Sequence, residues 1–226
     1  MAVNVSQIRL ETANLSPGAT PETKTRTPAS SPNTSEIDWR VSLTVPDVLK
    51  NPVGPVLSPL IGSTGTRGRM IFPFTPTIIY SHTANYNTIS PTHSNYPFPA
   101  YQNSQVNAMT IVGDFFVENA KEGEYWIAAV HYLRSITKMA YGATSNQGAP
   151  PPVVKLNGYG DYVFKDVPVT VQMFTVELPS DVDYIQVGLG ENGSWAPTRS
   201  SISIVVQPTY SRKSVTEFSL DAFVNG

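Results

Sequence analysis

Residues 123–141, GEYWIAAVHYLRSITKMAY, decide the fold because they are the one good helix candidate in the chain. Their apolar residues recur at spacings of three and four, which is typical of a helix with a single apolar face. That stripe consists of Trp126, Ala129, Val130, Leu133, Ile136 and Ala140. Glu122 and Glu124 favour the helix start, Lys138 favours its end, and Gly142 suits a left-handed cap. We therefore expect one helix, at about 123–141, that packs on a sheet.

The sequence before this helix has the two-residue period of β-strands. In residues 39–45, Trp39, Val41, Leu43 and Val45 alternate with polar residues. Residues 70–81 are also strand-like, but Pro73 and Pro76 cannot donate hydrogen bonds, so we expect this segment at a sheet edge or at a bend. Residues 105–118 form a further expected strand. Its one face holds Val106, Ala108, Thr110 and Val112, and Gly113 indicates a bulge.

Short strands are also expected after the helix, beyond the proline turn at 150–152. They cover residues 162–164, 168–178, 184–187 and 201–208. Turn signals separate them at Asn157-Gly158, at 179–181 and at 192–193, a spacing that favours antiparallel pairing. One helix among about seven strands predicts a mainly β fold with the helix on one face.

Two further segments lack such periodicity. Residues 46–69, with a Gly-rich run at 62–69, are expected to form a surface loop. Residues 1–36 are rich in Pro, Thr, Ser and Asn and are expected to be extended or disordered. They form either a plain tail or an arm that docks on a neighbour. Residues 37–226 are then one β domain.

Composition excludes several classes of function. The 226 residues carry 15 Lys+Arg and 17 Asp+Glu, so the chain has no basic excess for wrapping duplex DNA. Charged residues make up 14% of the chain, against about 25% in ordinary domains. Cysteine is absent, which excludes disulfides, thiolate metal sites and cysteine nucleophiles. No membrane-spanning run or secretory signal is visible, so no membrane partner is expected.

No catalytic pattern stands out, and we expect no enzyme, no cofactor and no metal site. The run at 62–69 lacks the Gly-Lys-Ser/Thr ending of a phosphate loop. The three histidines, His82, His93 and His131, accompany no nucleophile motif. The carboxylate pairs Glu122/Glu124 and Asp181/Asp183 lie at a helix start and in a turn, where structural roles are favoured.

The strongest functional signal is a polar, aromatic stretch at residues 82–104, which we expect to be a long loop. It contains the candidate interface residues Tyr86, Asn95, Tyr96, Phe98 and Tyr101, and no Lys or Arg lies between Ile71 and Gln105. Such aromatic residues can stack on bases or sugars, but base-stacking sites are usually lined with cations. Aromatic residues with Asn and little charge instead favour the core of a protein interface. A second contact candidate is the turn of Gly158, Tyr159, Gly160 and Asp161.

Nine segments, in chain order, carry a resemblance to a known family. They are MIFPFTPT (70–77), HTANY (82–86), NYPFPAYQNSQV (95–106), YWIAAVHYLRSITKMAYG (125–142), PPPVVKLNGYGDYVF (150–164), VPV (167–169), LPSDVDYI (178–185), QPTYSR (207–212) and FSLDAFVNG (218–226). Together these segments, from about residue 38 onward, resemble the baseplate tail-tube initiator or tail-tube cap proteins of contractile-tailed bacteriophages.

The resemblance implies a tail-tube-like antiparallel β-sandwich or partial barrel of two packed sheets with one outer helix. Six copies would form a homohexameric ring whose inner strands make one β-barrel around the lumen. The implied partners are the tail tube protein, the baseplate hub, a second junction ring protein and the tape measure protein, with genomic DNA as cargo only. The implied location is the virion tail, after assembly in the host cytoplasm. The alternatives are the major tail tube protein and, from another class, a carbohydrate-binding β-sandwich module.

Overall fold

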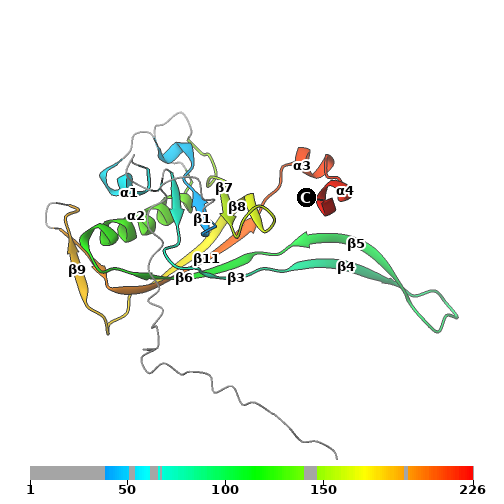
Figure 1. Ribbon diagram of the computed structural model, residues 1–226. Coiled ribbons are helices and arrows are strands. Elements are labelled where there is room, and N and C mark those ends of the chain that lie inside the picture. The colour runs from blue at the N-terminus through cyan, green and yellow to red at the C-terminus, as the bar shows by residue number, and fades with distance from the viewer. Residues whose placement is uncertain are drawn as a thin grey trace, which may run out of the picture. The chain divides into compact units, whose positions relative to one another are not determined.

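The computed structural model describes residues 39–50, 54–61, 66, 68–139, 147–190 and 193–225 (Figure 1). All of them belong to the unit Ser31–Gly226. The expected N-terminal arm at 1–36 lies outside the described residues. So do Ala140, Tyr141 and Gly142 at the expected helix end, and most of the Gly-rich run at 62–69.

The described fold is mainly β, as expected. Its main element is a seven-stranded antiparallel sheet with the order β2-β1-β7-β8-β11-β6-β3. Its strands are β1 (Ser42–Thr44), β2 (Arg69–Ile71), β3 (Thr77–Ile79), β6 (Met109–Phe116), β7 (Val154–Gly158), β8 (Phe164–Glu177) and β11 (Arg199–Pro208). Two two-stranded sheets pair β4 (His82–Ile89) with β5 (Phe98–Val106) and β9 (Tyr184–Val187) with β10 (Ser194–Pro197). Instead of two packed sheets, the described strands therefore make one large sheet and two small ones.

The strand–proline argument for residues 70–81 is confirmed. The segment divides into β2 and β3, which are the two edge strands of the large sheet. Pro73 and Pro76 lie between these strands, where no ladder hydrogen bond is lost. The strands expected at 168–178, 184–187 and 201–208 are also present, as β8, β9 and β11.

The expected helix is α2 (Ala120–Ile136), which begins three residues earlier than predicted. Asn119 caps it, because its Oδ1 accepts a hydrogen bond from the Glu122 N–H at 3.0 Å, and the Glu122 carboxylate accepts one from the Glu118 N–H at 2.8 Å. The apolar stripe from Trp126 to Ile136 is buried as predicted. Trp126 Nε1 also donates to Ser200 Oγ at 2.7 Å, which joins the helix to β11.

Strand β6 corrects two predictions. Its buried face is Met109, Ile111 and Phe115, not the face that begins with Val106. There is no bulge at Gly113, since β6 pairs with β11 in continuous register through this residue. Gly113 is needed for space: a Cβ built there lies 2.4 Å from a ring carbon of Phe72.

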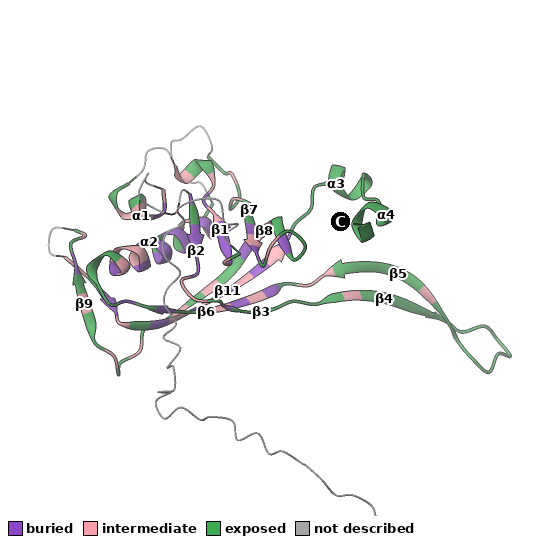
Figure 2. Cartoon of the chain, in the orientation of Figure 1, coloured by how far each residue is buried: buried purple, intermediate pink, exposed green. Residues whose placement is uncertain are grey.

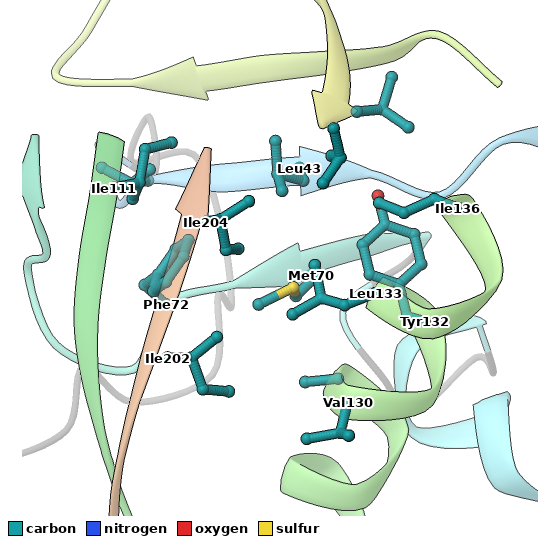
Figure 3. Packing of buried hydrophobic residues seen from close by; sticks show 14 of the residues in the cluster. Leu43, Met70, Phe72, Ile111, Val130, Tyr132, Leu133, Ile136, Ile202 and Ile204 are labelled. Atoms are coloured by element: carbon teal, nitrogen blue, oxygen red, sulfur yellow. The ribbon is translucent and has the colours of Figure 1, made fainter. Parts of the chain in front are cut away.

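The contact between Phe72 and Gly113 shows how the sheet curls. Phe72 follows the edge strand β2, whereas Gly113 lies in β6, near the other end of the strand order. Side chains of β1, β2, β6, β11 and α2 therefore share one core, in which Leu43, Met70 and Tyr132 meet Ile111 and Ile204 (Figure 3). The result is an open, curved sheet with α2 on its concave side.

Other local predictions differ in detail. Tyr162 and Val163 lie in a turn, because β8 begins at Phe164, and Asn157-Gly158 ends strand β7 instead of forming a turn. Trp39 is exposed rather than buried with Val41. The expected loop at 46–69 contains η1 (Asp47–Leu49), η2 (Pro55–Leu57) and α1 (Ser58–Ile61). Among the described residues, no helix has the length and apolar character needed to cross a membrane.

Candidate assembly surface

Residues 82–106 form a two-stranded ribbon, not the structureless loop that we expected. Strands β4 and β5 pair antiparallel from His82↔Val106 to Ile89↔Phe98. The ribbon continues the β3–β6 pair of the large sheet, where Ile79 is opposite Thr110. It leaves the sheet as a hairpin that has no further strand beside it in the described chain (Figure 1).

The two strands of the ribbon were not predicted from the sequence because almost all their residues are exposed (Figure 2). A strand shows apolar–polar alternation when one of its faces is buried, and here neither face is. The available signal was composition: Tyr and Thr in β4 and Phe and Tyr in β5 have high β propensity, and they flank a tip with proline and serine.

Hydrogen bonds join the root of the ribbon to the sheet. The Asn107 side-chain amide donates to Ser81 Oγ at 2.9 Å and to Thr83 Oγ1 at 2.7 Å. Gln207 Nε2 of β11 donates to the Val106 carbonyl at 2.9 Å. The ribbon root is therefore held by the side chains of Asn107, just after β5, of Thr83 on β4 and of Gln207 on β11.

Of the predicted interface residues, the structure brings two into contact. Tyr86 and Tyr101 are directly opposite in the register, with ring centroids 5.8 Å apart in an edge-on arrangement. Phe98 opens β5 opposite Ile89. Asn95 and Tyr96 lie at the tip of the hairpin, and the Tyr96 side chain is 79% exposed. All five residues thus lie on the ribbon and are open to solvent.

The ribbon carries no formal charge. Residues 70–113 contain no Asp, Glu, Lys or Arg, and their only histidines are His82 and His93. Single exposed apolar residues are ordinary, but many exposed aromatic rings with little charge are typical of interaction sites, so the ribbon is a candidate for one. The large exposed apolar and aromatic side chains of this uncharged stretch are Ile79, Tyr80, Tyr86, Ile89, Tyr96, Phe98 and Tyr101.

The two strands of the ribbon differ as pairing edges. On β5, Pro99 cannot donate a hydrogen bond, and the register shift between Asn85/Asn103 and Tyr86/Tyr101 leaves Gln102 as an extra, bulged residue. Strand β4 has no proline and no charge. Within the described chain, no side chain hydrogen-bonds to the β4 backbone. Proteins normally protect exposed edges with prolines, bulges or charges, and β4 has none of these.

The far edge of the large sheet is closed by the protein itself. Phe72 N–H donates to the Val41 carbonyl, so the neighbouring Ile71 groups point away from β1. The Tyr125 hydroxyl of α2 accepts from the Ile71 N–H at 2.7 Å and donates to the Ile71 carbonyl at 2.6 Å. The Thr66 hydroxyl donates to the Arg69 carbonyl of the same edge. Edge strand β2 is therefore capped, whereas the edge formed by β3 and β4 is open.

The second candidate, the turn at 158–161, is mostly engaged within its own chain. Tyr159 and Gly160 have positive φ angles of 58° and 87°, a conformation that glycine adopts readily and tyrosine rarely. Tyr159 donates through its N–H to the Trp39 carbonyl at 2.8 Å and through its hydroxyl to the Pro76 carbonyl at 3.2 Å. Asp161 forms an exposed ion pair with Lys165 at 3.2 Å. Of the predicted residues here, Gly158 belongs to β7, where a Cβ would lie 3.1 Å from the Val41 backbone.

The sheet face opposite the core is rich in hydroxyl groups. On β11 the residues of this face alternate with the buried Ile202 and Ile204. On β6 and β8 the face consists of the residues paired with these outward-facing residues of β11. Its uncharged polar members are Thr110, Thr170, Thr175, Ser201, Ser203 and Gln207, and the apolar Val112, Phe116, Met173 and Val205 lie on the same face. At one end of this face, Asp114, Glu177 and Asp181 line a shallow hollow together with Arg199. Sequence reasoning singled out Asp181 but missed Asp114 and Glu177, which only the strand register brings together.

No metal centre is formed by these or other side chains in the described ranges, since no three potential ligands are grouped to hold an ion. The scan against protein-family models found no match to the chain, and neither did the search of curated proteins.

Proposed function

We propose that this protein is a structural component of a bacteriophage virion. It forms a six-membered ring at the junction of baseplate and tail tube, and the ring templates tail tube polymerisation around the DNA channel. The observation that carries the proposal is the ribbon, an exposed, uncharged and aromatic hairpin with one unprotected pairing edge. The resemblance of nine ordered sequence segments to tail-tube initiator proteins supports it.

In this proposal, ring formation uses the open edge of the sheet. An edge with free N–H and C=O groups pairs readily with another strand. The β3–β4 edge is open and the β2 edge is capped, so the open edge does not pair with β2 of a neighbour. Pairing of β4 with β4 of another copy would give a two-fold dimer, whereas in the proposed ring the ribbon contacts a different surface of the next copy. Contacts of this heterologous kind generate closed rings when the rotation closes. A single chain of this length has a radius of gyration of about 17 Å, so enclosing a DNA channel needs several copies.

The hydroxyl-rich sheet face is suited to the lumen of such a ring. Ser and Thr side chains offer DNA no fixed positive charge, and tight DNA binding depends on Lys and Arg at the phosphates. The cations on this face include Arg199, at the end of β11 beside Asp114 and Glu177, and Lys155 of β7, which lies 3.8 Å from the Asp166 carboxylate. DNA then passes as cargo without being held. The opposite side of the sheet, covered by α2, faces outward.

In this role the ring has one face on the baseplate hub and the second junction ring protein, and the other on the first ring of the tail tube protein. The tape measure protein passes through the lumen. The protein resides in the virion tail after assembly in the host cytoplasm.

A tube-growth experiment tests the proposal. Purified protein is mixed with tail tube subunits and the hub, and tube length and number are followed by negative-stain microscopy. We expect tubes to start at this protein's rings, with about six copies per tube. Tubes in which this protein repeats along the whole length would instead make it the major tail tube protein. A stable monomer that binds to a glycan array would favour the carbohydrate-binding module.

The double variant Tyr96→Ala/Tyr101→Ala tests the part played by the ribbon. Both side chains are exposed, so the monomer fold is expected to persist while ring formation weakens. Tyr162→Ala, at a turn residue outside the ribbon that is 88% exposed, is the matched control. Normal rings from the ribbon variant would contradict the assignment of this surface.

A further inference from the structure

The C-terminal segment, residues 212–225, exposes nearly all of its apolar side chains. It contains α3 (Arg212–Thr216) and α4 (Leu220–Asn225), and neither helix has a buried residue (Figure 2). Val215, Phe218, Leu220, Phe223 and Val224 are each at least 60% exposed. Exposing five apolar side chains to water is unfavourable, since each would be stabilised by burial. We infer that the surface on which this segment packs is not part of the described chain.

The segment is nevertheless shaped locally. Ser211 Oγ accepts from the Ser214 N–H at 3.1 Å and caps α3, and Ser219 Oγ accepts from the Ala222 N–H at 3.3 Å near the start of α4. The rings of Phe218 and Phe223 lie 5.7 Å apart. Helices of five and six residues are too short to persist alone in water, so stable helices here depend on packing against a partner.

The charges of the segment are balanced within it. Arg212 and Lys213 oppose Glu217 and Asp221, and Lys213 Nζ lies 3.9 Å from Glu217 Oε1. A strongly acidic or basic partner surface therefore offers it little. What the segment presents is apolar and electrically neutral, which is also the character of the ribbon.

The segment leaves the sheet beside the root of the ribbon. Strand β11 ends at Pro208, and Thr209 N–H donates to the Pro168 carbonyl at 2.9 Å. One residue before the strand end, Gln207 Nε2 bonds to the Val106 carbonyl at the ribbon root. Both exposed apolar elements thus start at the same end of the sheet (Figure 1). A contact between copies that involves one of them brings the other close.

We propose that, in the ring, residues 212–225 of one copy pack their apolar side chains onto the ribbon of a neighbouring copy. The inference rests on the proposed function, because it needs a ring. A second copy is the partner rather than the same chain: the short connection 209–211 places the segment near its own ribbon root, yet neither helix buries a residue there. The two surfaces match in their lack of net charge and in their aromatic content.

Mixed-isotope crosslinking tests the contact directly. Unlabelled chains that carry a photo-crosslinking phenylalanine analogue at position 223 are assembled with ¹⁵N-labelled wild-type chains, and crosslinked peptides are identified by mass. We expect peptides that join 212–225 of an unlabelled chain to 82–106 of a labelled chain. Crosslinks within one chain only, or onto residues outside 82–106, overturn the inference.

Paired variants give a second readout. Phe218→Ser/Phe223→Ser is expected to raise the concentration at which rings dissociate by about tenfold or more, since buried aromatic anchors dominate interface energies. Val48→Ser, at an exposed apolar residue of η1, is the control and should leave it unchanged. Rings of unaltered stability from the double variant overturn the inference but leave the proposed function intact. Absence of rings from the wild-type protein with its partners overturns both.

Discussion

The hydroxyl of Tyr125 satisfies both backbone groups of Ile71, accepting from its N–H at 2.7 Å and donating to its carbonyl at 2.6 Å. A helix side chain thereby takes the place that a further strand would occupy beside β2. Burial raises the pKa of Tyr125 above its ordinary value, although the bond with Ile71 and the charge of Arg40 act in the opposite direction. The hydroxyl therefore keeps the proton that it donates, and this edge stays closed while the β3–β4 edge remains open.

Tyr125→Phe should destabilise the fold. The change removes one hydroxyl and leaves the Ile71 N–H and carbonyl without their partner, so we expect a loss of about 1–3 kcal/mol in the free energy of unfolding. Urea denaturation measures it. Tyr101→Phe, which removes an exposed hydroxyl on the ribbon, should change the same quantity by less than about 0.5 kcal/mol. Equal stabilities of the two variants would refute the capping role.

Gly113→Ala should be destabilising through overpacking. A Cβ at this position lies 2.4 and 2.8 Å from two ring carbons of Phe72, so the ring or the strand must move. We expect a cost of about 1–3 kcal/mol, seen as a lower thermal midpoint. Gly188→Ala is the matched control, because nothing lies within 4 Å of its added Cβ. Combining Gly113→Ala with Phe72→Leu should cost less than the sum of the two single changes, and strict additivity would argue against the contact.

A charge on the open edge should block assembly. Asn87→Lys places a lysine on β4, where strand pairing between copies is expected, whereas Gln102→Lys places one at the bulge of β5. Sedimentation velocity should show at least about a tenfold weakening of the ring for Asn87→Lys and a smaller effect for Gln102→Lys. Circular dichroism should show both variants folded. The reverse order of effects would assign pairing to β5.

Ring stability should depend little on ionic strength. Residues 70–113 have no formal charge, so contacts made by the ribbon contain no ion pair that salt can screen. Raising the salt concentration from about 0.05 to 0.5 M should change the ring dissociation constant by less than about threefold. A steep loss of rings with salt would place the main contacts on charged surfaces elsewhere.

Sequence patterns predicted several of the elements that face the core. Helix α2 was predicted from the period that burial imposes on its residues, and strands β8, β9 and β11 from the turn signals that separate them. The proline argument also placed β2 and β3 at sheet edges. The ribbon and the helices α3 and α4 have no buried face, so the period is missing and these elements were not predicted. Strand β7 was missed although Val154 and Leu156 are buried, because Asn157-Gly158 indicated a turn.

Contacts between distant residues were beyond sequence analysis. Tyr125 and Ile71 are 54 residues apart, and nothing in either segment indicates that one caps the other. Gly113 was interpreted as a bulge because a glycine in a strand usually marks one, and only the curl of the sheet reveals that Phe72 fills its space. The candidate interface residues of the ribbon were found from composition alone, but their pairing across two strands was not.

Native mass spectrometry of the purified protein, with and without the baseplate hub, tests the central claim most directly. The account predicts a discrete species of about six copies, which disappears in the Asn87→Lys variant but persists in Gln102→Lys. A wild-type chain that stays monomeric at every concentration and with every partner would contradict it.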